Sequence, residues 1–165
     1  MNKQHYIKFT DNHISDIVKS FNNKGYARLG KVISSKLVSK LKKRTEDLMM
    51  GRVKYKNMFF KLDDPTGNYF KIKHQDTKNE VFSGPSNRYK KIKDLEYDPL
   101  FLDLIQCNLF KSISKKLIGQ NVSSMRAMIL NKSFIKSSIL PFHQDVSLNW
   151  PMTGKPKFTV WLSLN

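Results

Sequence analysis

Hydrophobic residues near the start of the chain recur at the spacing of two amphipathic helices. Residues 11–23 place apolar side chains at i, i+3, i+4 and i+7, and Gly25 suits the end of that helix. A second helix begins after Ser34 or Ser35, either of which can cap it, and ends at Gly51. The apolar positions are Ile14, Ile17, Val18 and Phe21 in the first helix and Leu37, Val38, Leu41, Leu48 and Met49 in the second. Both stripes predict helices that pack on a core.

Two more helical segments follow the pair Asp98-Pro99. The first carries Leu100, Phe101, Leu104 and Ile105, and the second carries Leu109, Ile113, Leu117 and Ile118 before Gly119. Asn108 can cap the second of them. The middle of the chain, residues 52–90, reads as polar, with turn signals at 63–67 and 83–85.

Alternating patterns predict strands toward the end of the sequence. Residues 125–130, within a segment from 122 to 134, form one strand, and residues 158–164 form another. In the latter, Thr159, Trp161 and Ser163 share one face, and Val160, Leu162 and Leu164 share the other. Residues 26–33 and 69–73 are weaker strand candidates.

Helices that lead and strands that follow are typical of an α+β fold, with helices packed against an antiparallel sheet or barrel. The 165 residues suffice for one domain, since a chain of this size buries roughly two-thirds of its extended surface. We therefore predict a single domain, 1–165, in which residues 1–121 are mainly helical support and residues 122–165 form the first strands.

The charge of the chain suggests a nucleic-acid binder but does not settle it. Thirty Lys and Arg against 13 Asp and Glu give a net charge of +17. Arginine, which reads phosphates and bases in bidentate fashion, supplies five of the thirty. The basic residues are scattered, and the densest clusters, 40–44 and 88–93, lie on predicted helices or their approaches. A solvated basic surface is favoured. A non-catalytic module that binds RNA or another polyanion is the alternative.

Other features point to a soluble cytoplasmic protein. No apolar run approaches the roughly 18 residues that a membrane span needs, and the first ten residues are polar. Cys107 is the single cysteine, so an internal disulfide is excluded, as expected in a reducing compartment. The oligomeric state is not readable from the sequence.

Candidate chemistry lies in the segment Pro141-Phe142-His143-Gln144-Asp145. In an extended chain His143 and Asp145 project to the same side, so both can bind one metal ion. They supply two donors of the facial triad that holds non-haem Fe(II). The same tripeptide occurs at His74-Gln75-Asp76, where charged neighbours and the lack of an apolar wall favour a chance match exposed to solvent. A hydrogen-bonded His and Asp in a loop is the structural alternative for either copy.

The surroundings of the second copy resemble the phytanoyl-CoA dioxygenase family. Three ordered segments carry the likeness: MRAMILNK at 125–132, PFHQD at 141–145 and FTVWLSL at 158–164. The opening FNNKGY at 21–26, DPLF at 98–101 and LIG at 117–119 are also similar to that family. The likeness covers nearly the whole chain in order, with residues 52–87 matching least.

This resemblance implies a fold, an activity and a set of site residues. The fold is a double-stranded β-helix, a jelly-roll or cupin-like barrel supported by N-terminal helices. The activity is hydroxylation of an unactivated C–H bond in a small organic or acyl substrate, using Fe(II), 2-oxoglutarate and dioxygen, with ascorbate as a possible reductant. His143 and Asp145 match iron ligands, and Lys91, Met128 and Trp161 match positions that contact 2-oxoglutarate. Asp145 implies hydroxylation, because halogenating relatives carry a small residue there.

Two family residues have no counterpart in this sequence. The third iron ligand is a downstream His, followed by an Arg that pairs with the far carboxylate of 2-oxoglutarate, and neither occurs between residue 145 and Asn165. We therefore expect the sequence to be the N-terminal part of a longer dioxygenase with an incomplete barrel, and the isolated fragment to be inactive.

Overall fold

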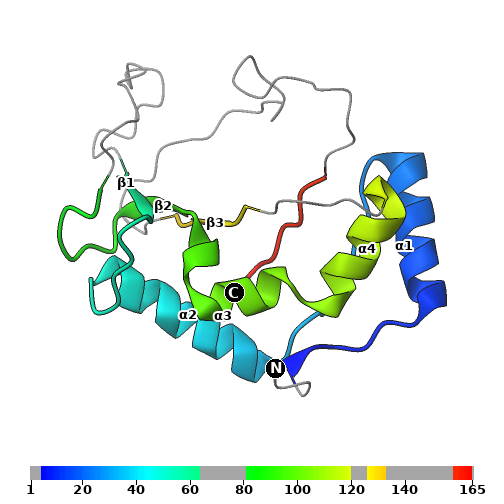
Figure 1. Ribbon diagram of the computed structural model, residues 1–165, viewed down its shortest axis with the longest axis horizontal. Helices are drawn as coiled ribbons and strands as arrows, with labels where there is room; N and C mark the ends of the chain where they lie inside the picture. The colour runs from blue at the N-terminus through cyan, green and yellow to red at the C-terminus, as the bar shows by residue number, and fades with distance from the viewer. Residues whose placement is uncertain (1–4, 64–80, 120–125, 133–157, 165) are drawn as a thin grey trace, which may run out of the picture. The chain divides into compact units, whose positions relative to one another are not determined.

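The computed structural model describes residues 5–63, 81–119, 126–132 and 158–164 (Figure 1). The elements follow the order α1 (Asp11–Lys24), α2 (Ser35–Met49), β1 (Phe59–Leu62), β2 (Tyr89–Lys93), the 3-10 helix η4 (Leu95–Tyr97), α3 (Pro99–Ile105), α4 (Asn108–Ile118) and β3 (Met128–Leu130). Helices and an antiparallel sheet confirm the α+β class. The described strands form one open three-stranded sheet, so the barrel stays a proposal. The described helices include none long and apolar enough to cross a membrane.

The chain forms two compact units that are interleaved in sequence. The first comprises Met1–Lys43, Pro99–Met125 and Gly154–Asn165, and the second comprises Arg44–Asp98 and Arg126–Thr153. Helix α2 begins in the first unit and ends in the second. The prediction of one domain with a change of character after residue 121 stays a prediction.

In the first unit, α1 begins at a residue that caps its free backbone N–H groups and ends at a glycine. Thr10 Oγ1 accepts the backbone N–H of His13, and His13 Nδ1 accepts the N–H of Thr10, which together form a capping box. Gly25, at φ 76°, closes the helix in the left-handed conformation that glycine adopts without strain. The predicted first helix and its glycine stop are confirmed.

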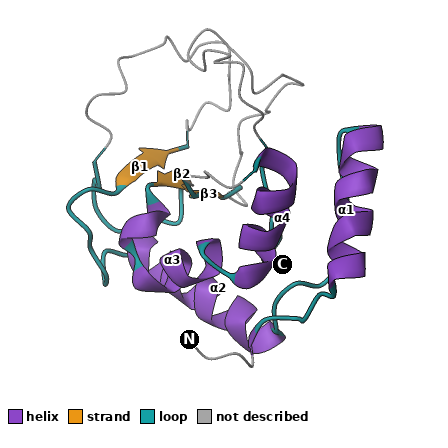
Figure 2. Ribbon diagram, turned by 45° about the vertical axis from the view of Figure 1, so that its right-hand side comes forward, coloured by secondary structure: helices purple, strands orange, loops and turns teal. Residues whose placement is uncertain are grey.

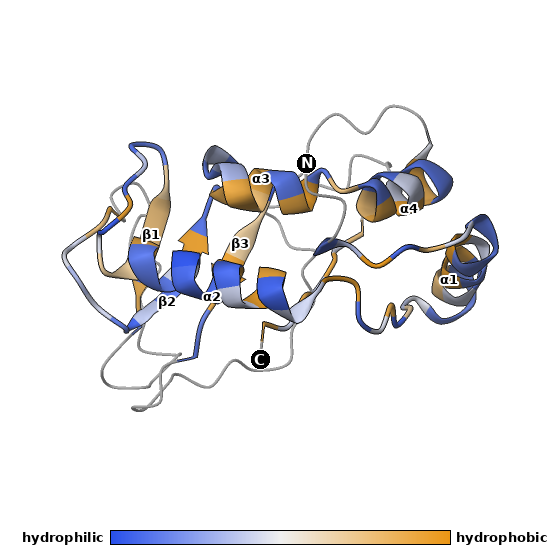
Figure 3. Ribbon diagram, turned by 90° about the horizontal axis from the view of Figure 1, so that it is seen from below, coloured by the Kyte–Doolittle hydropathy of each residue, from blue (hydrophilic) through white to orange (hydrophobic). Residues whose placement is uncertain are grey.

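Helix α1 packs against α4, as Figure 2 shows. Helix α4 buries Leu109, Phe110 and Ile113 on one side, which Figure 3 colours as hydrophobic. On the exposed side of the pair, Lys116 Nζ donates to Ser15 Oγ at 2.9 Å. Of the predicted stripe, Leu109 and Ile113 are buried and the last two positions are half-buried, whereas the buried Phe110 was not predicted.

Ser34 caps α2 as predicted, but two other expectations for the first unit are wrong. The Ser34 hydroxyl accepts the N–H of Leu37 at 3.3 Å. The strand expected at 26–33 is reduced to an isolated bridge between Ile33 and Tyr6, because Gly30 at φ 66° interrupts the extended backbone. Asn108 is the first residue of α4 rather than its cap; Cys107 holds the cap position and makes no side-chain capping bond.

Residues 158–164, predicted to form a strand, are not paired with any of the described strands. Their side chains do alternate, since Thr159, Trp161 and Ser163 are exposed while their neighbours are half-buried. However, the segment belongs to no β-ladder among the described residues, and a strand requires a hydrogen-bonded neighbour. The predicted alternation of the side chains is confirmed, and the pairing of this segment stays a prediction. The candidate strand at 69–73 lies outside the described residues.

The second unit is built on a sheet with the order β1-β2-β3, antiparallel throughout. Phe60 lies opposite Ile92, which lies opposite Ile129, and Phe60 and Ile92 are buried. The end of α2, with Leu48 and Met49 buried, lies beneath the strands in Figure 1. Strand β1 and the first two residues of β2 fall in the region 52–90 that was predicted to be polar, and all but the first residue of the cluster 88–93 lies on β2, not on a helix or its approach. Both strands carry lysines on one face, and this is why the sequence pattern did not reveal their alternation of exposed and buried residues.

Three aromatic rings extend the core of the second unit beside the sheet. Phe60 meets Tyr89 edge-on at 5.3 Å between centroids, and Phe82 stacks on Tyr89 at 5.7 Å. The Tyr89 hydroxyl accepts the N–H of Ser83 and donates to the carbonyl of Gly84, each at 2.8 Å. These bonds fix the turn predicted at 83–85 against the start of β2.

The pairing of Tyr6 with Asp103 in the first unit predicts a loss of stability at high pH. The Tyr6 hydroxyl donates to Asp103 Oδ2 at 3.1 Å, and burial, reinforced by that carboxylate, raises the pKa of Tyr6 above its usual value of about 10. The contribution of Tyr6 to stability is therefore complete below about pH 10 and is lost as the pH rises from there through the folded pKa. We expect Tyr6→Phe to lower the free energy of unfolding by about 1 kcal/mol at pH 8.

Denaturant unfolding of the wild type and of Tyr6→Phe at pH 8 and pH 11 measures this effect. The difference between the two proteins should shrink at the higher pH. A difference that is equal at both pH values would contradict the assigned hydrogen bond.

Candidate functional site

The two copies of the His-Gln-Asp tripeptide lie outside the described residues. This applies to His143 and Asp145, the predicted iron ligands, and equally to His74 and Asp76. Within the part of the chain that the structure describes, no three His, Cys, Asp or Glu side chains lie close enough to hold a metal ion. The described site is therefore built from the predicted cosubstrate contacts.

Lys91 and Met128 lie on the same face of the sheet, on adjacent strands. Lys91 lies opposite Leu130 and Lys93 lies opposite Met128, so Lys91 and Met128 are diagonal neighbours. Directly paired residues of an antiparallel ladder project to the same side. Two residues that are 37 positions apart in sequence, both predicted to contact 2-oxoglutarate, are thus brought together.

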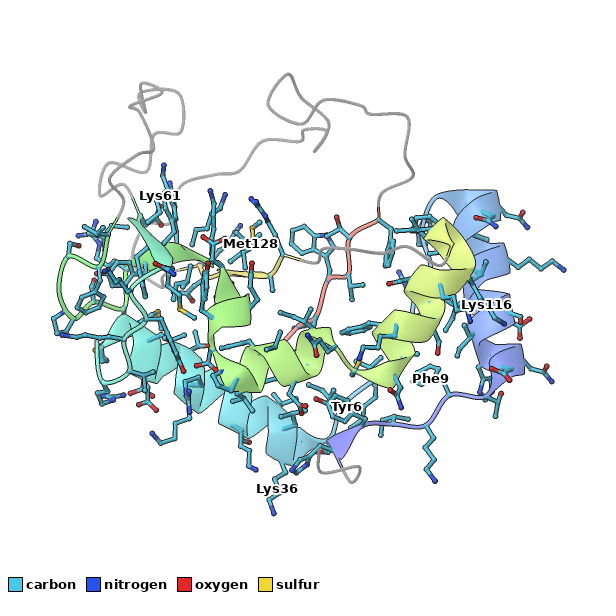
Figure 4. All side chains as sticks on the ribbon, viewed as in Figure 1. Tyr6, Phe9, Lys36, Lys61, Lys116 and Met128 are labelled. Atoms are coloured by element: carbon cyan, nitrogen blue, oxygen red, sulfur yellow. The ribbon has the colours of Figure 1, made fainter. Side chains whose placement is uncertain are left out.

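Strand β1 adds to this face from its other edge. Lys61 lies opposite Lys91, and Phe59 lies opposite Lys93. We name the resulting surface the lysine face, and it consists of Phe59, Lys61, Lys91, Lys93, Met128 and Leu130. Figure 4 shows the side chains of Lys61 and Met128 on the same side of the sheet.

The lysine face combines positive charge with exposed apolar surface. Met128 is 42% exposed and Leu130 is 48% exposed, although both are large hydrophobic side chains on a regular strand. The Lys93 ammonium lies 4.4 Å from the centroid of the Phe59 ring, a cation–π contact. Apolar groups beside a few convergent polar ones are typical of small-molecule sites.

A β-bulge at one end of β1 separates a fourth lysine from this face. The register shifts between Lys61 and Leu62, so that Leu62 pairs with Tyr89 and Lys90 has no direct partner in β1. Lys90 Nζ instead lies 3.8 Å from Oδ1 of the buried Asp63. The charge of Lys90 is therefore matched by a carboxylate away from the lysine face.

Asn131 fixes the edge strand β3 to β2. Its backbone N–H donates to the carbonyl of Lys90 at 3.0 Å, and its side-chain amide donates to the carbonyls of Tyr89 at 3.1 Å and Asn87 at 3.3 Å. On the other end of β3, Glu96 accepts the N–H of Ala127. These bonds hold Met128 in register beside Lys93.

Trp161 lies in the other unit from Lys91 and Met128. It belongs to the segment without regular secondary structure at 158–164, and its side chain is 72% exposed. Its predicted contact with 2-oxoglutarate stays a prediction.

A second polar cluster, in the unit that contains the sheet, contributes to the fold and not to the candidate site. The carboxylate of Asp98 is fully buried and accepts from Arg44 Nη1 at 2.7 Å, and the same nitrogen lies 3.4 Å from the Tyr55 hydroxyl. The hydrogen bond to Asp98 raises the pKa of Arg44, and burial, with the nearby carboxylate, raises the pKa of Tyr55. The cluster therefore joins Arg44 of α2 to Asp98, the residue that precedes α3.

Sequence reasoning missed Lys61 and Lys93 as parts of the site. Both are ordinary lysines in a basic chain, and their placement depends on the register of β1 and β2. Comparison of the chain with family models, with curated proteins and with solved structures finds no match.

Proposed function

We propose that the chain is part of an Fe(II)- and 2-oxoglutarate-dependent dioxygenase of the phytanoyl-CoA dioxygenase family. Its reaction would be hydroxylation of an unactivated C–H bond in a small organic or acyl substrate. The observation that carries the proposal is the juxtaposition of Lys91 and Met128 on the lysine face. The sequence resemblance predicted both residues as contacts of one ligand, and the register of β2 and β3 supports that expectation.

The described residues fit a dianionic acid. Three ammonium groups, from Lys61, Lys91 and Lys93, project from one face and can pair with carboxylates through charge-assisted hydrogen bonds. The exposed side chains of Met128 and Leu130 provide an apolar wall for the carbon chain of such an acid. This mixture suits 2-oxoglutarate, whose two charged ends are joined by methylene groups.

The donor set at 143–145 fits Fe(II), because an imidazole and a carboxylate are two of the ligands of the facial triad. When bound, iron and 2-oxoglutarate supply the oxidising chemistry, while the protein supplies binding and orientation. Lys91 would hold a carboxylate of the cosubstrate, and Met128 would exclude water beside it. Asn131 would keep β3 in the register that this contact requires.

Turnover tests the proposal through Lys91→Gln. With Fe(II), 2-oxoglutarate and ascorbate, we expect succinate release from the full-length protein, and Lys91→Gln should raise the KM for 2-oxoglutarate by about 10-fold or more. Lys56→Gln is the matched control, because Lys56 is exposed and lies in the same unit outside the sheet. The proposal fails if iron-dependent succinate release is absent, or if the two variants behave alike.

The alternative, a basic module that binds RNA or another polyanion, is favoured by the same lysines. However, adjacent strands lie about 4.8 Å apart, so the three strands span only about 10 Å. A surface of this width covers one or two phosphates of a nucleic acid, whereas it matches a small diacid. The lysine face therefore favours the small molecule.

Binding of duplex DNA and structured RNA separates the two functions. We expect weak, nonspecific and strongly salt-dependent association, with Kd of roughly 10⁻⁴ to 10⁻⁶ M at physiological salt. Filter-binding titrations at several salt concentrations measure it. Nanomolar, sequence-selective binding at that salt would replace the dioxygenase proposal with the polyanion-binding one.

A further inference from the structure

We propose that Lys93, held in place by the ring of Phe59, binds a carboxylate of the cosubstrate, and that Phe59 is a positioning residue for this contact. The inference rests on the proposed function and names two residues that the sequence resemblance did not assign. Lys93 comes from β2, the central strand of the sheet, and Phe59 comes from β1.

Phe59, Lys93 and Met128 form one row across the lysine face. Phe59 lies directly opposite Lys93 in the ladder between β1 and β2, and Lys93 lies directly opposite Met128 in the ladder between β2 and β3. Direct partners have β-carbons roughly 4.5–5.5 Å apart, whereas diagonal neighbours, such as Lys91 and Met128, are farther apart. A ligand that contacts Met128 therefore lies within the reach of the Lys93 side chain.

The ring of Phe59 holds the Lys93 ammonium without neutralising it. The ammonium nitrogen lies 4.4 Å from the centroid of the ring, and both residues are half-buried. An aromatic ring attracts a cation through its quadrupole but carries no net charge, so this contact leaves the positive charge of Lys93 able to attract an anion. Lys90 on the same strand differs, because its ammonium lies 3.8 Å from a carboxylate oxygen of the buried Asp63.

An ammonium that is already held in place binds an anion at a lower entropic cost. A lysine side chain loses rotamer freedom when it binds a ligand, and a side chain that is ordered beforehand loses less. The contact with Phe59 orders Lys93 in this way, and a charge-assisted hydrogen bond to a carboxylate then supplies affinity. Removal of the ring should therefore weaken the binding of an anion, although Phe59 itself carries no charge.

Calorimetric titration of 2-oxoglutarate into the full-length protein with Fe(II) under anaerobic conditions tests both roles. We expect Lys93→Gln to weaken binding about 10-fold or more. Phe59→Leu keeps an apolar side chain but removes the ring, and should weaken binding about 5-fold. Phe59→Tyr keeps the ring and should stay within about 2-fold of the wild type.

Lys54→Gln is the matched control, because Lys54 also lies over an aromatic ring of the same unit but outside the sheet. Its ammonium nitrogen is 5.6 Å from the centroid of the Phe82 ring. This variant removes one positive charge and one cation–π contact, and should bind 2-oxoglutarate within about 2-fold of the wild type. Thermal unfolding followed by circular dichroism verifies that each variant is folded.

A double-mutant cycle determines whether Phe59 acts through Lys93. If it does, Phe59→Leu should change binding by less than about 2-fold in a protein that already carries Lys93→Gln. Additive losses would show that Phe59 acts on the ligand or on the fold by another route, and would overturn its positioning role.

The remaining outcomes separate this inference from the proposed function. If Lys93→Gln binds 2-oxoglutarate as tightly as Lys54→Gln does while Lys91→Gln binds it more weakly, the inference about Lys93 is overturned and the proposed function stands. A wild-type protein that does not bind 2-oxoglutarate in the presence of Fe(II) would overturn the function and the inference together.

Discussion

Replacing His143 with alanine is expected to abolish Fe(II) binding and to lower turnover by at least about 100-fold in the full-length protein. The imidazole would be one of few protein ligands to the metal, and the loss of one ligand from an open facial site removes a large part of its affinity. His74→Ala, in the identical tripeptide, should leave both quantities within a few-fold of the wild type. Metal content after dialysis and succinate release measure the two effects.

His74→Ala is a close control for His143→Ala because the two histidines are followed by the same two residues. Any general effect of removing a histidine from a His-Gln-Asp sequence appears in both variants. Equal losses from His143→Ala and His74→Ala would contradict the assignment of the iron site.

The second large effect is expected at the buried ion pair of Arg44 and Asp98. Arg44→Met leaves the fully buried Asp98 carboxylate without the guanidinium that lies 2.7 Å from it. Removing one partner of a buried pair typically costs 3–5 kcal/mol, and because about a third of the Arg44 side chain is exposed we expect about 2–3 kcal/mol. Denaturant unfolding at pH 7 measures the change in the free energy of unfolding.

Arg52→Met is the comparison variant, since Arg52 also pairs with carboxylates, of the exposed Glu46 and the buried Asp47, while half of its own side chain is exposed. Because the Arg52 guanidinium is more exposed than that of Arg44, its pairs are better screened by water, and this variant should lie closer to the wild type. The double variant Arg44→Met/Asp98→Asn should recover part of the loss, because the stranded charge is then removed. An Arg44→Met protein as stable as Arg52→Met would show that the pair with Asp98 does not stabilise this unit.

The helices could be predicted from the sequence because their apolar residues recur at i, i+3, i+4 and i+7, the spacing of an amphipathic helix. The predicted range 11–23 differs from α1 by a single residue, and Ser34 caps α2 through its own hydroxyl. Local chemistry decides such boundaries, since a serine or threonine at the cap and a glycine at the stop act on the adjacent turn. Only the cap of α4 was misassigned, by one residue, to Asn108.

Strands β1 and β2 escaped prediction because their solvent-facing positions are lysines and their buried positions are few. In Tyr89–Lys93 only Tyr89 and Ile92 are buried, and the bulge beside Lys90 breaks the alternation that a strand pattern needs. The opposite case is 158–164, where the alternation is perfect and no ladder forms among the described residues. Alternation of polar and apolar residues shows which side chains are exposed, whereas the pairing of strands depends on segments far away in the sequence.

The candidate site, like the fold, could be predicted only in part from the sequence. Resemblance to a family suggested Lys91 and Met128, which the fold places on one face. Lys61 and Lys93 could not be selected from 30 basic residues, because their relation to Lys91 exists only in the register of the sheet.

The alternation of lysines and apolar residues in the sheet also protects its assembly. Strands β1 and β2 must find each other across the 26 residues that separate Leu62 from Tyr89, a search in which neighbouring alignments compete. A slip of β1 by one residue would turn Lys61 into the core and Phe60 out to water. Burying an unpaired ammonium costs several kcal/mol, so such misaligned intermediates are strongly disfavoured during folding. The lysines that would bind a small acid in the folded protein thus also disfavour the wrong strand register while the chain folds.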